Sequence, residues 1–290
     1  MSVDVMPEML SREELADLAE AVRLLESRGF ASRLTAMFGS QVEAIGRAFP
    51  SSARGVVVHA TESALKAALR VAIASLDPRS RGKASNRLHK AAAAASGAIG
   101  GAFGISALAV ELPISTTILL RSIAEIAREE GEDLARPEAS LACFEVFALG
   151  GHAGEDAAIE CGYLAVRAAL ARSVSESARL ILQQGLAGET APVVVRLIPQ
   201  VAARFGVSVS QKIAAQAVPI LGAVGGAAVN AAFADHFQTM ARGHFIVRRL
   251  ERTHGAEAVG FEYRRLRNEA LANARETLGN ADGLSGNKRR

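Results

Sequence analysis

The chain has 290 residues and a net charge of only +3, and half of its residues are hydrophobic although 4% are aromatic and tryptophan is absent. Together with 26 glycines, this composition is typical of closely packed helices, and it excludes collagen, a disulfide-bonded scaffold and a disordered chain. Because the basic residues are not interleaved with aromatic ones, we expect no nucleic acid as a partner.

Three helices are predicted before residue 77. Ser11 and Glu14 have the spacing of a capping box, and the apolar stripe that follows predicts a helix that ends at Gly29. Prolines then limit two further helices, which we expect over about 31–48 and about 57–76.

A compact basic run follows the third predicted helix. It contains five cations and no aromatic residue: Arg79, Arg81, Lys83, Arg87 and Lys90. The run is either a solvated linker or a surface that attracts anionic lipid headgroups, since it directly precedes an apolar segment.

Two segments, 91–120 and 213–234, carry almost no charge. Each contains glycines at small-xxx-small spacing, which allows close helix packing: Gly97, Gly100, Gly101 and Gly104 in the first, and Gly222, Gly225 and Gly226 in the second. We expect these two helices to cross at their glycine faces in the core of one bundle. Insertion into a membrane is the alternative, because both segments are long enough to span one.

The other predicted helices are separated by proline, glycine and serine. We expect Pro113 to kink or break its helix, Pro199 to kink the helix over 192–205, and Ser208 or Ser210 to cap the helix that begins near residue 213. The expected helices from residue 137 onwards cover 137–150, 156–171, 175–184, 192–205, 213–252 and 257–277.

Several polar residues stand out against this apolar background: Glu111, Asn230, Asp235, His236 and His244. If the two glycine-rich helices pack together, these residues form a ligand-binding cluster around Glu111 and His236. The alternative is structural, with Glu111 capping a broken helix and Asp235 and His236 returning to solvent. No HExxH motif is present, so we expect no metal and no cofactor.

The order of several short motifs resembles the EcsC family of bacterial proteins over about residues 55–265. These motifs are ELPISTT at 111–117, IAEIA at 123–127, GEDL at 131–134, PE at 137–138, VPILGA at 218–223 and NAAF at 230–233. The resemblance implies a bacterial, largely helical protein without an established activity, and it supplies no catalytic residues. The namesake of the family is linked with an ABC transporter system.

The sequence therefore predicts an all-α protein with N-terminal helices in 1–54, an EcsC-like domain in 55–278 and a disordered tail in 279–290. We expect a non-enzymatic accessory protein of the cytoplasm, peripheral to the inner membrane. Its candidate partners are an anionic membrane surface, a membrane protein and a second copy of the chain. The alternative is an enzyme, or a protein that binds a small ligand or metal, with its site around Glu111 and His236.

Overall fold

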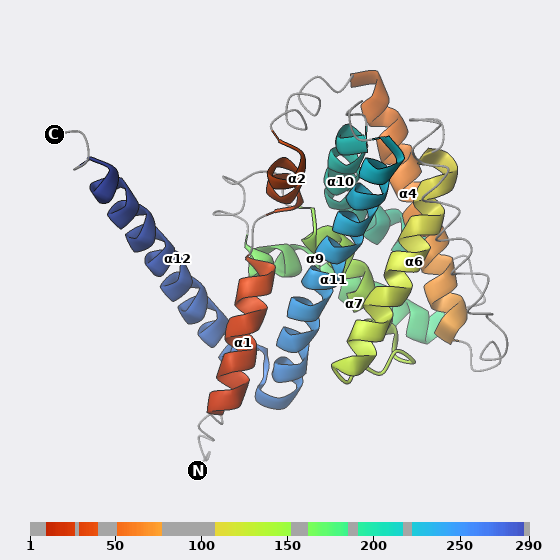
Figure 1. The fold of residues 1–290 in the computed structure, drawn as a ribbon. Coiled ribbons are helices and arrows are strands. Elements are labelled where there is room, and N and C mark those ends of the chain that lie inside the picture. Colours follow the sequence, from red (N-terminus) through yellow and green to blue (C-terminus); the bar gives the residue numbers. More distant parts are fainter. Residues whose placement is uncertain are drawn as a thin grey trace, which may run out of the picture. The chain divides into compact units, whose positions relative to one another are not determined.

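The computed structural model is built from α-helices, and no β-strand occurs in the residues that it describes, which are 10–26, 29–39, 51–76, 108–151, 162–184, 191–216 and 222–286. The all-α prediction is therefore confirmed. The helices are α1 (Arg12–Leu25), α2 (Phe30–Phe38), α4 (Ser51–Leu76), α6 (Leu108–Glu129), α7 (Pro137–Leu149), α9 (Tyr163–Gln184), α10 (Ala191–Gln216), α11 (Gly222–His254) and α12 (Ala256–Gly286) (Figure 1).

Contacts along the chain define two compact units. Unit 1 combines Met1–Ser27 with Gly243–Arg290, and unit 2 consists of Arg28–Arg242. The division falls within α11, whereas the sequence suggested a boundary after residue 54. Only α1 of the predicted N-terminal region belongs to unit 1.

The start of α1 is fixed by hydrogen bonds that the sequence predicted. The Ser11 hydroxyl accepts a bond from the Glu14 backbone N–H at 3.2 Å, and the Glu14 carboxylate accepts one from the Ser11 N–H at 2.8 Å. His254, at the end of α11, donates from Nε2 to the same carboxylate at 2.7 Å. These bonds, of which that from His254 contributes most, lower the pKa of Glu14 to about 2.

Unit 1 is held together by the packing of α12 against α1. Val259 and Tyr263 lie buried on one face of α12, and the Tyr263 hydroxyl donates to Glu26 at 2.9 Å. Arg249 of α11 forms an ion pair with Asp17 of α1 at 2.8 Å. Buried apolar area and charge-assisted bonds therefore act together at the same helix faces.

Unit 2 is a bundle in which α4 packs against α6 and α10, while α7 packs against α9 and α10. Five phenylalanines form its aromatic core, with neighbouring ring centroids 4.9–6.0 Å apart. They are Phe30, Phe147, Phe205, Phe233 and Phe237. A chain with few aromatic residues thus concentrates them where four helices meet.

Helix α10 contains Pro199, as predicted, but it continues through both predicted cap serines instead of ending near residue 205. A proline inside a helix removes one backbone hydrogen bond, and here the surrounding packing outweighs that loss. The Ser208 hydroxyl instead donates to the Gly150 carbonyl at 2.8 Å, and Ser210 donates to the Gly206 carbonyl one turn earlier. Neither serine caps a helix.

Other helix ends also differ from the prediction. Helix α6 is uninterrupted at Pro113, and α9 is continuous where two helices were predicted. Helix α2 ends at Phe38 because Gly39 has a left-handed backbone (φ 78°), and α12 continues to Gly286 rather than ending near residue 277. Residues 287–290 of the predicted tail lie outside the described residues.

The end of α7 contacts its neighbours too closely for any side chain. A Cβ added at Gly150 would lie 2.3 Å from the Phe237 ring, and one at Gly151 would lie 2.1 Å from the Arg204 carbonyl oxygen. Because the Phe237 ring is fully buried, it has no space into which it can move.

We predict that Gly150→Ala lowers the free energy of unfolding by about 1–3 kcal/mol through overpacking. The matched control is Gly55→Ala, because nothing lies within 4 Å of a Cβ at this helical position. Alanine is the better helix former, so the control should gain up to about 1 kcal/mol. Urea unfolding of both variants measures the difference, and equal effects would contradict the packing described here.

Candidate functional site

The most buried charges of unit 2 form an ion pair between two helices. Glu111 lies in the first turn of α6 and Lys212 lies near the end of α10, and both side chains are more than nine-tenths buried. Lys212 Nζ donates to Glu111 Oε1 at 2.6 Å. Each group supplies the opposite charge that the other requires once both have left water.

The lysine also contacts the aromatic core. Its Nζ lies 5.0 Å from the centroid of the Phe233 ring on α11, within the range of a cation–π interaction. The ammonium group therefore connects a carboxylate on α6 with a ring on α11. Three helices thus meet around one cation.

A second polar centre lies at the Gly150 carbonyl, at the end of α7. This oxygen accepts hydrogen bonds from Ser208 of α10 and from His236 Nε2 of α11, each at 2.8 Å. A carbonyl at a helix end has no partner within its own helix, and these two side chains supply partners for it. His236 Nε2 carries the hydrogen in this contact, so this nitrogen is not available to coordinate a metal.

The remaining predicted site residues have different surroundings. Asp235 is largely exposed and forms an ion pair with Arg33 at 3.0 Å. The Asn230 side-chain oxygen accepts a bond from Gln216 at 3.3 Å. His244 belongs to unit 1, where it is buried with its ring 4.9 Å from that of Phe245.

The polar residues around Glu111 are therefore engaged in separate interactions. Glu111 pairs with Lys212, whereas His236 donates to a backbone carbonyl and Asp235 pairs with an arginine at the surface. A carboxylate bound to a lysine at 2.6 Å is a charge-neutral pair, and this arrangement holds helices together. Within the described parts of the chain, no group of three or more His, Cys, Asp or Glu residues could hold a metal ion.

Some predicted residues lie outside the described residues or at their edge. The basic run from Arg79 to Lys90 and the glycines from Gly97 to Gly104 lie in the undescribed segment 77–107. Gly222 and Gly225 lie at the start of α11, and a Cβ added at Gly226 would have no described neighbour within 4 Å outside its own helix backbone. The predicted glycine crossing therefore stays a prediction.

Lys212, the partner of Glu111, was not among the site residues predicted from the sequence. The signal was present, because Lys212 is the one charged residue between Arg204 and Asp235, as Glu111 is in 91–120. Two apolar segments that each contain a single charge, of opposite sign, predict a buried ion pair.

A comparison with models of protein families identifies the family of this chain. The model of the EcsC protein family matches residues 13–250. The chain belongs to the EcsC protein family. The match includes both partners of the buried ion pair, whereas α12 lies beyond its end. Searches of curated proteins and of solved structures found no match to this EcsC protein.

No helix in the described segments of this EcsC protein is both long and apolar enough to cross a membrane. This finding does not cover residues 91–107, which make up the greater part of the apolar segment 91–120 and lie outside the described residues. The second segment is described at 213–216 and from Gly222 onwards.

We predict that removing either partner of the ion pair is costly and that removing both is not. Lys212→Met leaves a buried carboxylate without its cation, and Glu111→Leu leaves a buried ammonium without its anion. Each single variant should lose about 3–5 kcal/mol, while the double variant should recover most of that loss. Chemical denaturation of all four proteins gives the coupling energy, and additive losses in the double variant would contradict a direct pair.

Proposed function

We propose that this EcsC protein is a non-catalytic helical accessory protein that binds to an anionic membrane surface. The observation that supports the non-catalytic part is the Glu111–Lys212 pair. Glu111, the most prominent residue of the predicted ligand-binding cluster, is bound to a lysine inside the bundle. Its carboxylate stabilises the packing of helices, and a general acid or base would instead need to reach a substrate.

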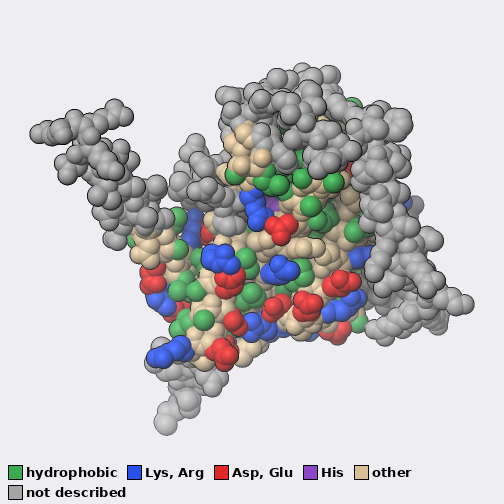
Figure 2. Space-filling view, viewed as in Figure 1, with side chains coloured by type: hydrophobic (Ala, Val, Ile, Leu, Met, Phe, Trp, Pro, Cys, Tyr) green, Lys and Arg blue, Asp and Glu red, His purple; other side chains and the backbone are tan. Residues whose placement is uncertain are grey.

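The membrane part of the proposal rests on the basic run. Five cations within residues 79–90 follow the end of α4, and clusters of this kind attract anionic lipid headgroups. The described surface offers no comparable concentration in the view of Figure 2, where basic and acidic side chains are interspersed. Binding through the run is electrostatic and therefore falls as salt increases.

Flotation with lipid vesicles tests this proposal. The full chain should float with vesicles of phosphatidylglycerol and phosphatidylcholine at low salt, remain at the bottom with phosphatidylcholine alone, and be released by high salt. Replacing all five cations of the run by glutamine should abolish flotation.

The matched control removes the same number of positive charges, five, from the described surface outside the basic run. It replaces five exposed arginines by glutamine: Arg12, Arg70, Arg128, Arg136 and Arg179. This control should retain most of the binding. Equal losses in the two variants, or flotation that does not depend on anionic lipid, would contradict the role of the run.

A further inference from the structure

The end of α11 and the start of α1 meet through one pair of titratable side chains. His254 is the last residue of α11, and its Nε2 donates to Glu14 Oε1 at 2.7 Å. Both residues belong to unit 1, so the contact lies within one compact part of the chain. The His254 side chain is only 6% exposed, which limits the screening of this contact by water and salt.

Each of the two side chains can carry the charge that its helix end favours. Gly255 ends α11 with a left-handed backbone (φ 84°) and donates its N–H to the Glu251 carbonyl at 2.9 Å. His254 therefore lies in the last turn, beside the negative end of α11, while Glu14 lies in the first turn of α1, where the helix end is positive. A protonated His254 is thus stabilised both by the Glu14 carboxylate and by the end of its own helix.

The Glu14 carboxylate keeps its charge across the neutral range. Hydrogen bonds from His254 and from Ser11 lower the pKa of Glu14 to about 2. The imidazole of a histidine ordinarily titrates near pH 6.5. Of the two partners, only the histidine therefore changes its charge between about pH 5.5 and about pH 8.5.

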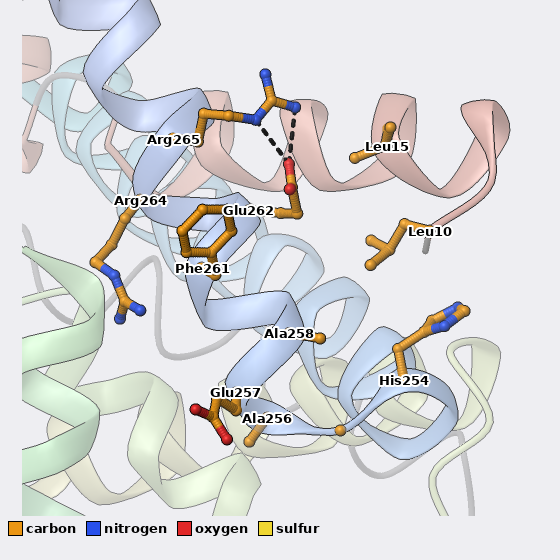
Figure 3. A pocket seen from close by; sticks show the side chains of 11 residues that line it. Leu10, Leu15, His254, Ala256, Glu257, Ala258, Phe261, Glu262, Arg264 and Arg265 are labelled. Carbon is orange, nitrogen blue, oxygen red and sulfur yellow. Dashed lines mark hydrogen bonds and ion pairs between the residues drawn. The ribbon is translucent and has the colours of Figure 1, made fainter. Parts of the chain in front are cut away.

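Four charged residues of α12 line a groove of unit 1 together with His254: Glu257, Glu262, Arg264 and Arg265. Glu262 and Arg265 form an ion pair at 2.7 Å. In Figure 3, Glu257 and Arg264 project from α12 away from the His254 ring. The carboxylate in contact with His254 is therefore that of Glu14 on α1.

The other charged groups close to this contact are guanidinium and carboxylate groups, which ordinarily keep their charge near neutral pH. Asp17 of α1 and Arg249 of α11 form an ion pair at 2.8 Å. His254 is the only histidine within residues 10–17 and 249–265, the parts of α1, α11 and α12 around the contact. The remaining charged groups there are Arg12 and Glu13 on α1 and Glu251 and Arg252 on α11.

We propose that His254 makes the attachment of the start of α1 to the end of α11 sensitive to pH. While the imidazole is protonated, the contact joins two opposite charges, and each helix end stabilises the charge beside it. Once the proton is lost, the neutral ring still donates from Nε2, but the attraction between charges is gone. Because the protonated ring favours the attached state, the attachment is strongest below about pH 6 and weakens as the pH rises through the titration of His254.

Hydrogen–deuterium exchange of the full chain at about pH 6 and about pH 8 tests the proposal. Each measured rate is divided by the intrinsic rate at the same pH, so that only the protection of the amides is compared. In the wild-type protein, the protection of α1 and of the last turn of α11 should fall about threefold or more between the two pH values. Helix α9 of unit 2, which contains no histidine, should change less.

Two variants remove one charge of the pair and keep the local hydrogen bonds. Glu14→Gln keeps the capping box with Ser11, because glutamine can replace glutamate in that motif. His254→Gln keeps a side-chain N–H donor that does not titrate. In both variants, the protection of α1 should no longer differ between the two pH values. The matched control is Glu13→Gln, which removes an exposed carboxylate from the same turn of α1 and should keep the pH dependence of the wild type.

Several results would overturn the proposal. Protection of α1 that is equal at the two pH values in the wild-type protein would show that the attachment does not respond to pH. A pH dependence that persists in Glu14→Gln or in His254→Gln would assign it to another titrating group. Its loss in Glu13→Gln as well would show that Glu14 has no specific role. Circular dichroism at both pH values confirms that each variant remains folded.

Discussion

The buried contact between Glu111 and Lys212 is the constraint on which unit 2 depends. Two charges taken out of water are tolerated only if each has its partner, so α6 and α10 must hold Oε1 and Nζ at bonding distance. Hydrophobic burial is non-directional, and in a bundle rich in alanine it would permit several arrangements of helices. The ion pair is directional, and together with the Phe233 ring it favours the arrangement of α6, α10 and α11 in which all three groups meet.

The same logic applies at the end of α7, where close packing and polar contacts coincide. Gly150 lies against Phe237 with no space for a methyl group, while its carbonyl is bound by Ser208 and His236. The described polar residues at these two centres therefore contribute to the packing of helices. Under the proposed function, the basic run would bind lipid, and the core would serve as a helical scaffold.

Much of the fold could be predicted from the sequence, because local signals such as the Ser11–Glu14 capping box, Pro137 at a helix start and long apolar periodicity are physically direct. Family membership was also accessible from the order of motifs. The continuity of α10 beyond residue 205 was not, because Ser208 and Ser210 are of a residue type that commonly caps helices, whereas here the helix continues to Gln216. The partner of Glu111 was missed for a related reason. The pairing joins residues 101 positions apart. The polar residues of the second glycine-rich segment, such as His236, were predicted as partners of Glu111 instead.

Hydrogen–deuterium exchange of the Glu111→Gln variant tests the central claim most directly. If the ion pair holds α6 and α10 in place, then weakening it should increase amide exchange in both helices, while α1 and the first half of α12 in unit 1 exchange as in the wild-type protein. Faster exchange in α6 alone, with α10 unchanged, would contradict the account, because it would show that the two helices are not held by this pair.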